Sequence, residues 1–262
     1  MEESLILIAI GIVAGIVGSI AGIGGGIIIV PALIEIFNAP SQHAAGTSLV
    51  VIVAIAFAST MAYAKQQRID YRSALLFITA SAPGAFLGAY IGKQFSEEAF
   101  TTFFGILMIL LFLFLSLDHK KQKSYGSPSI KRDFIDSVGK SHSYSFNRTI
   151  SLIVAFCVGL ISSLFGIGGG ALMVPAMIML FSFPIHIATA TSMLIILVSA
   201  IVGSFTHMAL GHVIWSYVLL LAPGAYIGGV LGARVAIKLR SNNLIYFLRL
   251  VILVVALRMI FI

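Results

Sequence analysis

Long apolar stretches separated by short polar segments run along almost the whole chain. Seven of these stretches cover residues 44–64, 74–92, 100–117, 150–165, 188–209, 213–237 and 244–262. Most of them approach the roughly 20 apolar residues that an α-helix needs to cross the hydrocarbon core of a bilayer. A further stretch, residues 5–37, is long for one crossing and short for two. The pattern predicts an all-α membrane protein that crosses the bilayer several times.

Composition supports this prediction. Apolar residues make up 60% of the chain and charged residues only 10%, against roughly 25% charged residues in a soluble domain. One soluble core of this size cannot bury so many apolar side chains. The acidic start Met1-Glu2-Glu3 differs from the basic start of a cleavable signal peptide, so we expect the first apolar stretch to be retained. The single cysteine, Cys157, excludes an internal disulfide, and we expect it to be a small core residue.

The chain also repeats itself. Residues 15–49 and 159–193 are identical at 16 of 35 aligned positions, and the motif Gly22-Ile23-Gly24-Gly25-Gly26 returns as Gly166-Ile167-Gly168-Gly169-Gly170. We therefore divide the chain into a first transmembrane repeat (1–117), a connector (118–148) and a second transmembrane repeat (149–262). Each repeat is expected to have a first element broken at its glycines, as a re-entrant segment or two half-helices, followed by three spans.

Glycines in such density predict a helix break, because each costs about 1 kcal/mol relative to alanine inside a helix. A break leaves helix-end N–H groups without partners, and a membrane tolerates such backbone only where protein buries it or a watery cavity meets it. The helix that restarts there points its positive N-terminus at the cavity, which favours an anion near the membrane midplane. The predicted substrate contacts are Gly22, Gly24, Gly25, Gly26, Gly166, Gly168, Gly169 and Gly170.

Two hydroxyl pairs, Thr47-Ser48 and Thr191-Ser192, are also repeated, and each opens a long apolar stretch. Hydroxyls near a helix start can cap the helix or donate a hydrogen bond to an anion oxygen. We include all four among the predicted substrate contacts and leave the capping interpretation open. A third repeated position, Ser19 in the first half and Ser163 in the second, is a candidate to line the same cavity.

The glycine motif has other interpretations. A dinucleotide-binding fingerprint needs Gly-x-Gly-x-x-Gly after a strand, but Ile27 stands where the third glycine is required. Tight helix packing by small residues stays open, although the duplication favours a binding site. A second set of glycines, spaced four residues apart, is predicted to pack helices instead: Gly84, Gly88, Gly92, Gly224, Gly228 and Gly232.

The net charge of +7 comes largely from the connector and does not indicate nucleic-acid binding. Seven of the 16 basic residues lie between positions 118 and 148, without regularly spaced stacking aromatics. We interpret this serine-rich segment as a solvated, partly disordered cytoplasmic connector whose electrostatic partners are anionic lipid headgroups. No nucleic-acid partner is expected, and a homodimer is left open.

The remaining cations bear on topology. If residues 5–37 cross once, the two halves have the same orientation and the loop of Arg234, Lys238 and Arg240 falls outside. If they enter, break and leave on the same side, that loop and the loop of Lys65 and Arg72 both lie inside. The second arrangement is an inverted repeat with both termini outside, and we favour it by the positive-inside rule.

Candidate ionisable residues are few. His43 and His186 lie beside the loops at Pro40 and Pro184, where a histidine could relay a proton, although a structural role is the alternative. Glu35 lies within an apolar stretch but has no counterpart in the second half. No catalytic constellation, clustered metal ligands or cofactor motif is present in the sequence, so an enzyme is not expected.

The chain resembles the TauE/SafE family of sulfite and organosulfonate exporters. The resemblance rests on the repeated glycine motif, the Val30-Pro31 that follows it, Gly46-Thr47-Ser48, and the sequence Ala-Pro-Gly-Ala around Gly84. It implies transport of small sulfur-containing anions, such as sulfite, organosulfonates or sulfoacetate, across a bacterial cytoplasmic membrane. Ala190 replaces the glycine of Gly46-Thr47-Ser48 in the second half, which weakens the equivalent contact there.

Two other functions stay open. A membrane interaction subunit would use its glycines for helix packing alone and would transport nothing. A cation permease is disfavoured, because the sequence has no duplicated carboxylate within its apolar stretches to bind the cation.

Overall fold

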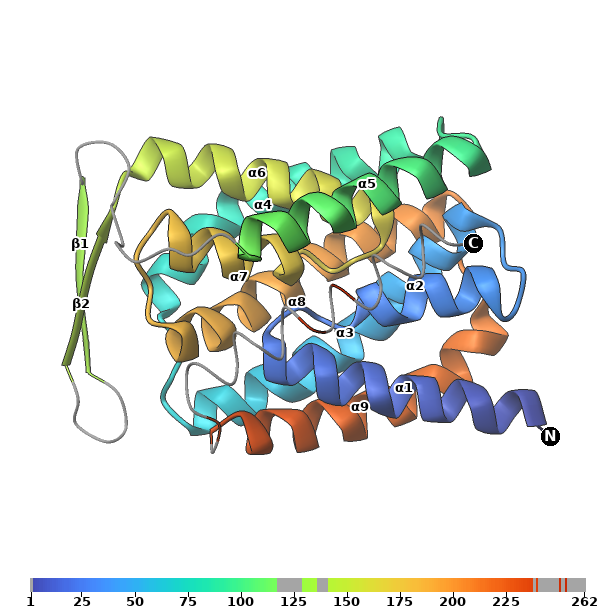
Figure 1. Ribbon diagram of the computed structural model, residues 1–262, viewed down its shortest axis with the longest axis horizontal. Helices are drawn as coiled ribbons and strands as arrows, with labels where there is room; N and C mark the ends of the chain where they lie inside the picture. Colours follow the sequence, from blue (N-terminus) through green and yellow to red (C-terminus); the bar gives the residue numbers. More distant parts are fainter. Residues whose placement is uncertain are drawn as a thin grey trace.

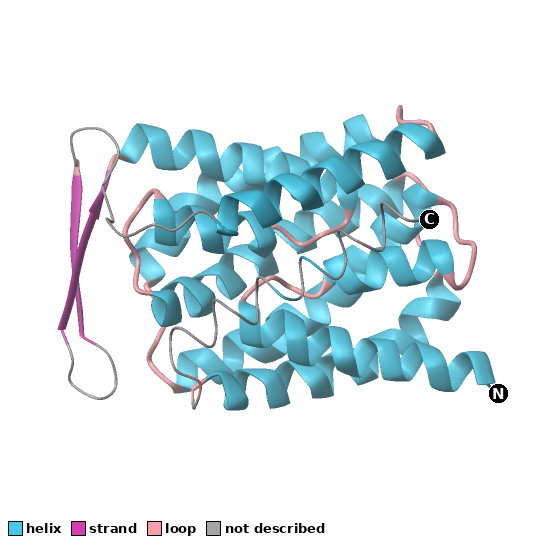
Figure 2. Ribbon diagram, in the orientation of Figure 1, coloured by secondary structure: helices cyan, strands magenta, loops and turns pink. Residues whose placement is uncertain are grey.

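The computed structural model describes residues 2–116, 129–135 and 141–237, together with residues 239, 250 and 253. In this part of the chain, nine helices form a bundle and two strands lie at one end of it (Figures 1 and 2). The first half contains α1 (Glu2–Ala21), α2 (Gly26–Glu35), α3 (Ser41–Lys65), α4 (Tyr71–Gly92) and α5 (Glu97–Ser116). The strands are β1 (Ile130–Ile135) and β2 (Ser141–Phe146). The second half contains α6 (Arg148–Phe165), α7 (Gly170–Met179), α8 (Ile185–Ala209) and α9 (Trp215–Ala236).

Six described helices, α1, α3, α4, α6, α8 and α9, are long and apolar enough to cross a membrane. Five of them largely cover the spans predicted at 44–64, 74–92, 150–165, 188–209 and 213–237, and α5 covers most of 100–117. The span predicted at 244–262 lies outside the described residues, except for residues 250 and 253. The prediction of a mostly helical protein with several membrane-spanning helices is confirmed.

The two halves place helices of matching length in the same order. α2 and α7 have 10 residues each, α3 and α8 have 25 each, and α4 and α9 have 22 each. Within each pair, the second helix begins 144 residues after the first; for example, α2 begins at residue 26 and α7 at residue 170.

Helices of opposite halves pack along each other. α1 runs parallel to α9, because Gly224, Gly228 and Gly232 meet the carbonyl groups of successive turns of α1. α6 runs parallel to α4 through the equivalent contacts of Gly84 and Gly88. At each of these five positions, a Cβ atom would overlap a carbonyl oxygen of the facing helix. The prediction that this second set of glycines packs helices is therefore confirmed at these five positions, while an added Cβ atom on the sixth, Gly92, would make only ordinary contact with Leu164.

The strands mark one end of the bundle, which we call the hairpin end. The hydroxyl group of Tyr144 in β2 donates a hydrogen bond of 2.7 Å to Asp70, the N-cap of α4. The side-chain amide of Gln66 donates over 3.1 Å to the carbonyl of Ala233 near the end of α9. The loop between α3 and α4, the end of α9 and the strands therefore share this end.

The N-terminus lies at the other end of the bundle, which we call the amino-terminal end (Figure 1). There, the rings of His43 in α3 and His212, just after α8, have centroids 5.6 Å apart. α3 and α8 cross the centre in opposite directions, since Gly46 at the start of α3 contacts His207 near the end of α8. α2 returns from the centre of the bundle toward the amino-terminal end (Figure 1).

The hairpin shows that part of the connector is folded. β1 and β2 pair antiparallel, with Ile130 opposite Phe146. The side chains of Tyr144 and Phe146 are buried, and both rings contact Phe183 of the loop before α8. The interpretation of the connector as a solvated segment did not foresee this hairpin, although Tyr144 and Phe146 alternate with polar residues as in a half-buried strand.

Cys157 does not pack in the core, and that expectation is wrong. Its side chain is exposed on α6. It lines an apolar groove together with Leu110 of α5 and Ile153 of α6, whose side chains are also exposed. A thiol is weakly polar, so an apolar surface tolerates it.

Candidate functional site

The repeated glycine motifs lie between helices. α1 ends at Ala21 and α2 begins at Gly26, while α6 ends at Phe165 and α7 begins at Gly170. All ten residues of the two motifs are buried. The backbone has a positive φ of 71° to 87° at Gly22, Gly24, Gly25, Gly166, Gly168 and Gly169. Residues with a Cβ atom rarely adopt this conformation, which explains the glycines at these six positions.

The two motifs pack against each other at the centre of the bundle. A Cβ atom on Gly26 would overlap the carbonyl oxygen of Gly166, and one on Gly170 would overlap the carbonyl oxygen of Gly22. A Cβ atom on Gly24 would lie only 3.8 Å from the Cα atom of Gly168. The structure therefore brings residues 144 positions apart, Gly22 and Gly166, into one buried region.

Two helices begin in this region. Ile28 and Ile29 donate the first hydrogen bonds of α2 to the carbonyl of Gly25, over 3.0 and 3.2 Å. Leu172 and Met173 do the same in α7 toward Gly169. N–H groups earlier in a first turn have no partner within their own helix, and the peptide dipoles give the helix start a partial positive charge. Both starts together form a partly positive region without a lysine or arginine in either motif.

Ser48 and Ser192 each reach across to the motif of the other half. The Ser48 hydroxyl oxygen lies 2.6 Å from the carbonyl oxygen of Gly166, and that of Ser192 lies 2.9 Å from the carbonyl oxygen of Gly22. Each hydroxyl is also 2.8 Å from a carbonyl oxygen in its own helix. A hydroxyl has one proton, so these two protons are committed to backbone carbonyls in this conformation.

Thr47 and Thr191 hold the loops that precede the fourth helix of the opposite half. The hydroxyl of Thr47 accepts a hydrogen bond of 3.0 Å from the N–H of Ile214, the N-cap of α9. The hydroxyl of Thr191 accepts one of 3.0 Å from the N–H of Asp70, the N-cap of α4. An accepting hydroxyl keeps its own proton for a further acceptor.

Ser19 and Ser163 occupy equivalent positions but have different surroundings. The hydroxyl of Ser19 donates over 2.9 Å to the carbonyl of Gly229. The hydroxyl of Ser163 is buried and has no hydrogen-bond partner among the described residues. A buried hydroxyl without a partner is costly, so Ser163 is a candidate to meet a ligand beside the second motif.

The carbonyl groups of these two serines are bound by different residue types. The hydroxyl of Tyr63 donates over 2.8 Å to the carbonyl of Ser19. In the second half, Nε2 of His207 lies 3.1 Å from the carbonyl oxygen of Ser163. A carbonyl only accepts, so Nε2 of His207 carries a proton, and Nδ1 of the neutral ring is an acceptor.

His207 belongs to a cluster of three histidines at the amino-terminal end. Nδ1 of His212 lies 3.3 Å from Nδ1 of His207, so His212 donates there and its own Nε2 can take up a proton. The ring of His43 packs against the ring of His212, and the two ring centroids are 5.6 Å apart. Burial lowers the pKa of His212 below its usual value, and the charges of His43 and Lys93 lower it further. Sequence reasoning missed His207 and His212, which have no histidine counterparts in the first half.

His186 is not part of this cluster. It stands at the start of α8, whereas His43 stands at the start of α3. These helices are antiparallel, so the structure separates the two histidines predicted as a relay. Among the described residues, no group of three or more His, Cys, Asp or Glu side chains is arranged to hold a metal ion.

Comparisons with known proteins find a matching family and several similar sequences. The family model described as sulfite exporter TauE/SafE matches residues 7–259. The probable membrane transporter protein YunE of Bacillus subtilis (strain 168) is 43% identical over 265 aligned residues, covering 98% of this chain and 97% of that protein. No solved structure matches the chain.

More distant relatives have similar names. The probable membrane transporter protein MJ0441 of Methanocaldococcus jannaschii is 25% identical, covering 91% of this chain and 88% of that protein. YfcA of Escherichia coli (strain K12), also described as a probable membrane transporter protein, is 23% identical over 89% of this chain and 80% of its own length.

Proposed function

This chain belongs to the TauE/SafE family of membrane transporters, and from that premise we propose that it carries small sulfur-containing anions across the bilayer. The substrates would be sulfite, an organosulfonate or a molecule such as sulfoacetate. The chain would act as a transporter and not as an enzyme, without a cofactor. A bacterial cytoplasmic membrane is the proposed location.

The observation that carries the proposal is the meeting of two helix starts between the glycine motifs. An anion placed between Gly24 and Gly168 would face the N-terminal ends of both α2 and α7. Helix N-termini bind anions through free N–H groups and their partial positive charge. A neutral site of this kind can release its ligand more readily than a buried arginine would, because no full charge is left unpaired.

Substrate entry requires the two motifs to move apart. In this structure, Gly26 and Gly170 touch the opposite motif so closely that neither tolerates a Cβ atom. Ser48 and Ser192 bind the carbonyl groups of Gly166 and Gly22. We infer that these serines turn carbonyl oxygens away from an incoming anion, which they would otherwise repel. Their role in the proposed site is to position the backbone.

Three other hydroxyl groups complete the proposed site. Thr47 and Thr191 accept hydrogen bonds from the loops before α9 and α4, so each can still donate its proton to an anion oxygen. Ser163, three residues before Gly166 in the sequence, has a buried hydroxyl without a partner among the described residues. We propose that it is a direct ligand in the second half, where its equivalent Ser19 is already bound to Gly229.

We further propose that the halves (1–117 and 149–262) are inverted repeats around this site and that the connector (118–148) is cytoplasmic. Arg72, Arg132 and Arg234 support this orientation, because all three belong to elements that meet at the hairpin end. Cytoplasmic ends of membrane proteins are enriched in such cations. The basic residues of the connector itself favour anionic lipid headgroups as its partners.

The histidine cluster is the proposed path of a coupling proton. A proton taken up on Nε2 of His212 allows Nδ1 of the same ring to pass its proton to His207. His207 in turn binds the carbonyl of Ser163, three residues before the second glycine motif. His43 would exchange protons between this cluster and the amino-terminal surface. His186 would serve separately, at the hairpin end.

Flux through proteoliposomes tests the function. Purified protein should accelerate the uptake of radiolabelled sulfite above that of empty liposomes, and unlabelled organosulfonates should compete. Rubidium uptake serves as the cation control and should stay at the background level. Folded protein that moves none of these solutes would support the interaction subunit, and rubidium flux would support a cation permease.

A further inference from the structure

A cavity of about 560 Å³ lies on the outside of the bundle at the hairpin end. Its lining includes three arginines from three different elements: Arg72 from α4, Arg132 from β1 and Arg148 from α6. The same cavity is lined by Leu75 and Thr79 of α4. It combines a strongly basic wall with an apolar one.

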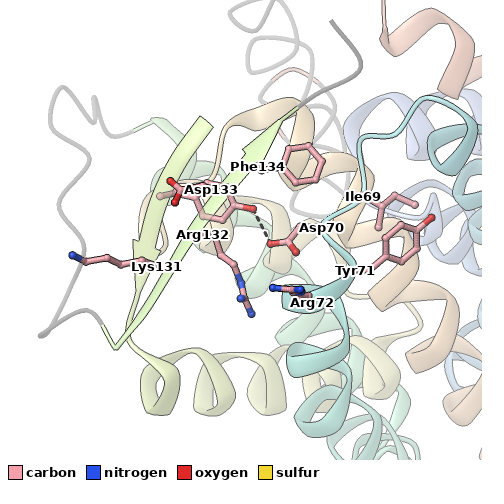
Figure 3. Close-up of a pocket in the computed structure, with 9 residues that line it drawn as sticks. Ile69, Asp70, Tyr71, Arg72, Lys131, Arg132, Asp133 and Phe134 are labelled. Carbon is pink, nitrogen blue, oxygen red and sulfur yellow. Dashed lines mark hydrogen bonds between the residues drawn. The ribbon is translucent and has the colours of Figure 1, made fainter. Parts of the chain in front are cut away.

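Two carboxylates lie in the adjoining cavity, shown in Figure 3, and both have other partners. Asp70 accepts hydrogen bonds from the N–H of Ser73 and from the hydroxyl of Tyr144. Burial and the charge of Asp70 raise the pKa of Tyr144 well above its usual value, so Tyr144 stays a donor. Asp133 accepts from the hydroxyl of Ser143 over 2.6 Å.

Arg72 and Arg132 extend toward the same side of the hairpin, while Lys131 and Asp133 point elsewhere (Figure 3). Arg132 donates from Nε to the hydroxyl of Ser73 over 3.4 Å, which fixes one edge of its guanidinium group. Among the described residues, the lining of the 560 Å³ cavity includes three arginines and no carboxylate. Like charges so placed repel each other, and an anion between them would remove that repulsion.

After Arg72, an exposed and largely apolar stripe continues along α4 toward its C-terminal end. Leu75, Phe86 and Tyr90 are 61%, 52% and 55% exposed. Their spacing from Arg72, with Thr79 between them, places them on one face of the helix. α4 is a candidate membrane span, so this face meets lipid tails while the arginines lie at the level of the headgroups.

We propose that this cavity binds the phosphate group of an anionic phospholipid, whose acyl chain lies along the exposed face of α4. Guanidinium groups bind phosphate oxygens in a bidentate manner. A soluble phosphate would satisfy the arginines but would leave the stripe uncovered, so the stripe favours a lipid. The proposal concerns the lipid-facing surface and does not depend on which solute the protein transports.

Native mass spectrometry of the purified full-length protein tests the site. The probe is phosphatidylglycerol, compared with phosphatidylcholine at equal concentration. The wild-type protein should retain one phosphatidylglycerol and little phosphatidylcholine. Arg72→Gln or Arg148→Gln should each weaken phosphatidylglycerol binding about fivefold, and the double variant about thirtyfold, since each cation near a membrane surface contributes on the order of a fivefold gain in affinity.

Arg234→Gln is the matched control, because it removes one exposed cation at the same end of the bundle but outside the cavity. It should retain phosphatidylglycerol as the wild type does. Arg148→Lys, which keeps the charge, should recover part of the binding. Glycerol 3-phosphate, the soluble form of the same chemistry, should not displace the lipid. Equal retention by the double variant and Arg234→Gln would overturn the site, and displacement by glycerol 3-phosphate would assign it to a soluble anion.

Discussion

The hydroxyl of Ser48 binds the carbonyl of Gly166 over 2.6 Å, and Ser192 makes the matching contact with Gly22 over 2.9 Å. Each serine lies on the central helix of one half and fixes the glycine motif of the other. The two halves therefore stabilise each other's helix breaks. Each break depends on contacts that its own half does not contain.

Replacing either serine should destabilise the protein to a similar extent. Ser48→Ala and Ser192→Ala each leave a buried carbonyl without its hydroxyl donor, which costs about 1–3 kcal/mol. We expect a lower midpoint of thermal unfolding for both variants in detergent. Thr101→Ala is the control, because that hydroxyl binds a carbonyl on the exposed surface of α5. If the thermal midpoint fell as much in Thr101→Ala as in the two serine variants, the contacts of Ser48 and Ser192 would contribute no more to stability than a surface hydrogen bond.

An alanine at the centre of the breaks should remove anion binding while the protein still folds. A Cβ atom on Gly24 would lie 3.3 Å from Ile52 and 3.4 Å from Ile196, so these side chains need to shift only slightly. The methyl group would stand between Gly24 and Gly168, where we place the anion. We expect sulfite binding, measured by calorimetry, to fall at least tenfold in Gly24→Ala.

Gly211→Ala is the control for backbone strain. Gly211 has a φ of 76°, close to the 85° of Gly24, but nothing lies within 4 Å of its added Cβ atom. Both substitutions therefore cost about 1–2 kcal/mol of strain, and only Gly24→Ala changes the proposed site. Unchanged sulfite binding in Gly24→Ala would place the site elsewhere. Gly25 is less informative, because its Cβ atom would lie 2.6 Å from the carbonyl oxygen of Ala14.

Much of the fold could be predicted from the sequence, because the membrane imposes a simple length rule on apolar helices. The repeated glycines also indicated where the helices end, since a dense group of glycines is unfavourable inside a helix. The sequence could not show that the two motifs touch. That contact is made where α3 and α8 cross in opposite directions, and Ile52 and Ile196 of these helices both lie beside Gly24.

Sequence reasoning missed two features, each for its own reason. The histidine cluster joins His43 to His207 and His212, and no local pattern links these positions. The hairpin was missed for a different reason. Its basic and serine-rich composition suggested a solvated segment, whereas Tyr144 and Phe146 supply enough buried aromatic surface to fix it on the bundle.

Acidification should destabilise the protein partly through His212. Its pKa is lowered in the folded state by burial and by the charges of His43 and Lys93. The unfolded ring takes up a proton near pH 6.5, so the unfolded state binds more protons just below that pH. The contribution of the neutral His212 ring to the stability of the fold is therefore complete above pH 6.5, and it is lost as the pH falls toward the lowered pKa.

His212→Gln should reduce this acid sensitivity. Between pH 7.5 and pH 5, we expect the midpoint of thermal unfolding to fall by fewer degrees in the variant than in the wild type. The proposed relay adds a second readout, since sulfite flux driven by a pH gradient should be lost while exchange of sulfite without a gradient continues. A variant with unaltered gradient-driven flux would exclude His212 from the proton path.

The proposed orientation predicts which end of the bundle reagents reach from outside the cell. Two exposed serines mark the two ends: Ser143 in the hairpin and Ser96 between α4 and α5. Each would be changed to cysteine in a Cys157→Ser background, because the native thiol is exposed and would add a background signal. A membrane-impermeant maleimide on intact cells should label Ser96→Cys, and label Ser143→Cys only after lysis. The reason is charge: Arg72, Arg132 and Arg234 gather at the hairpin end, and translocating that end would carry these cations outward against the membrane potential. Labelling of Ser143→Cys in intact cells would reverse the orientation, and with it the side from which the transported anion enters.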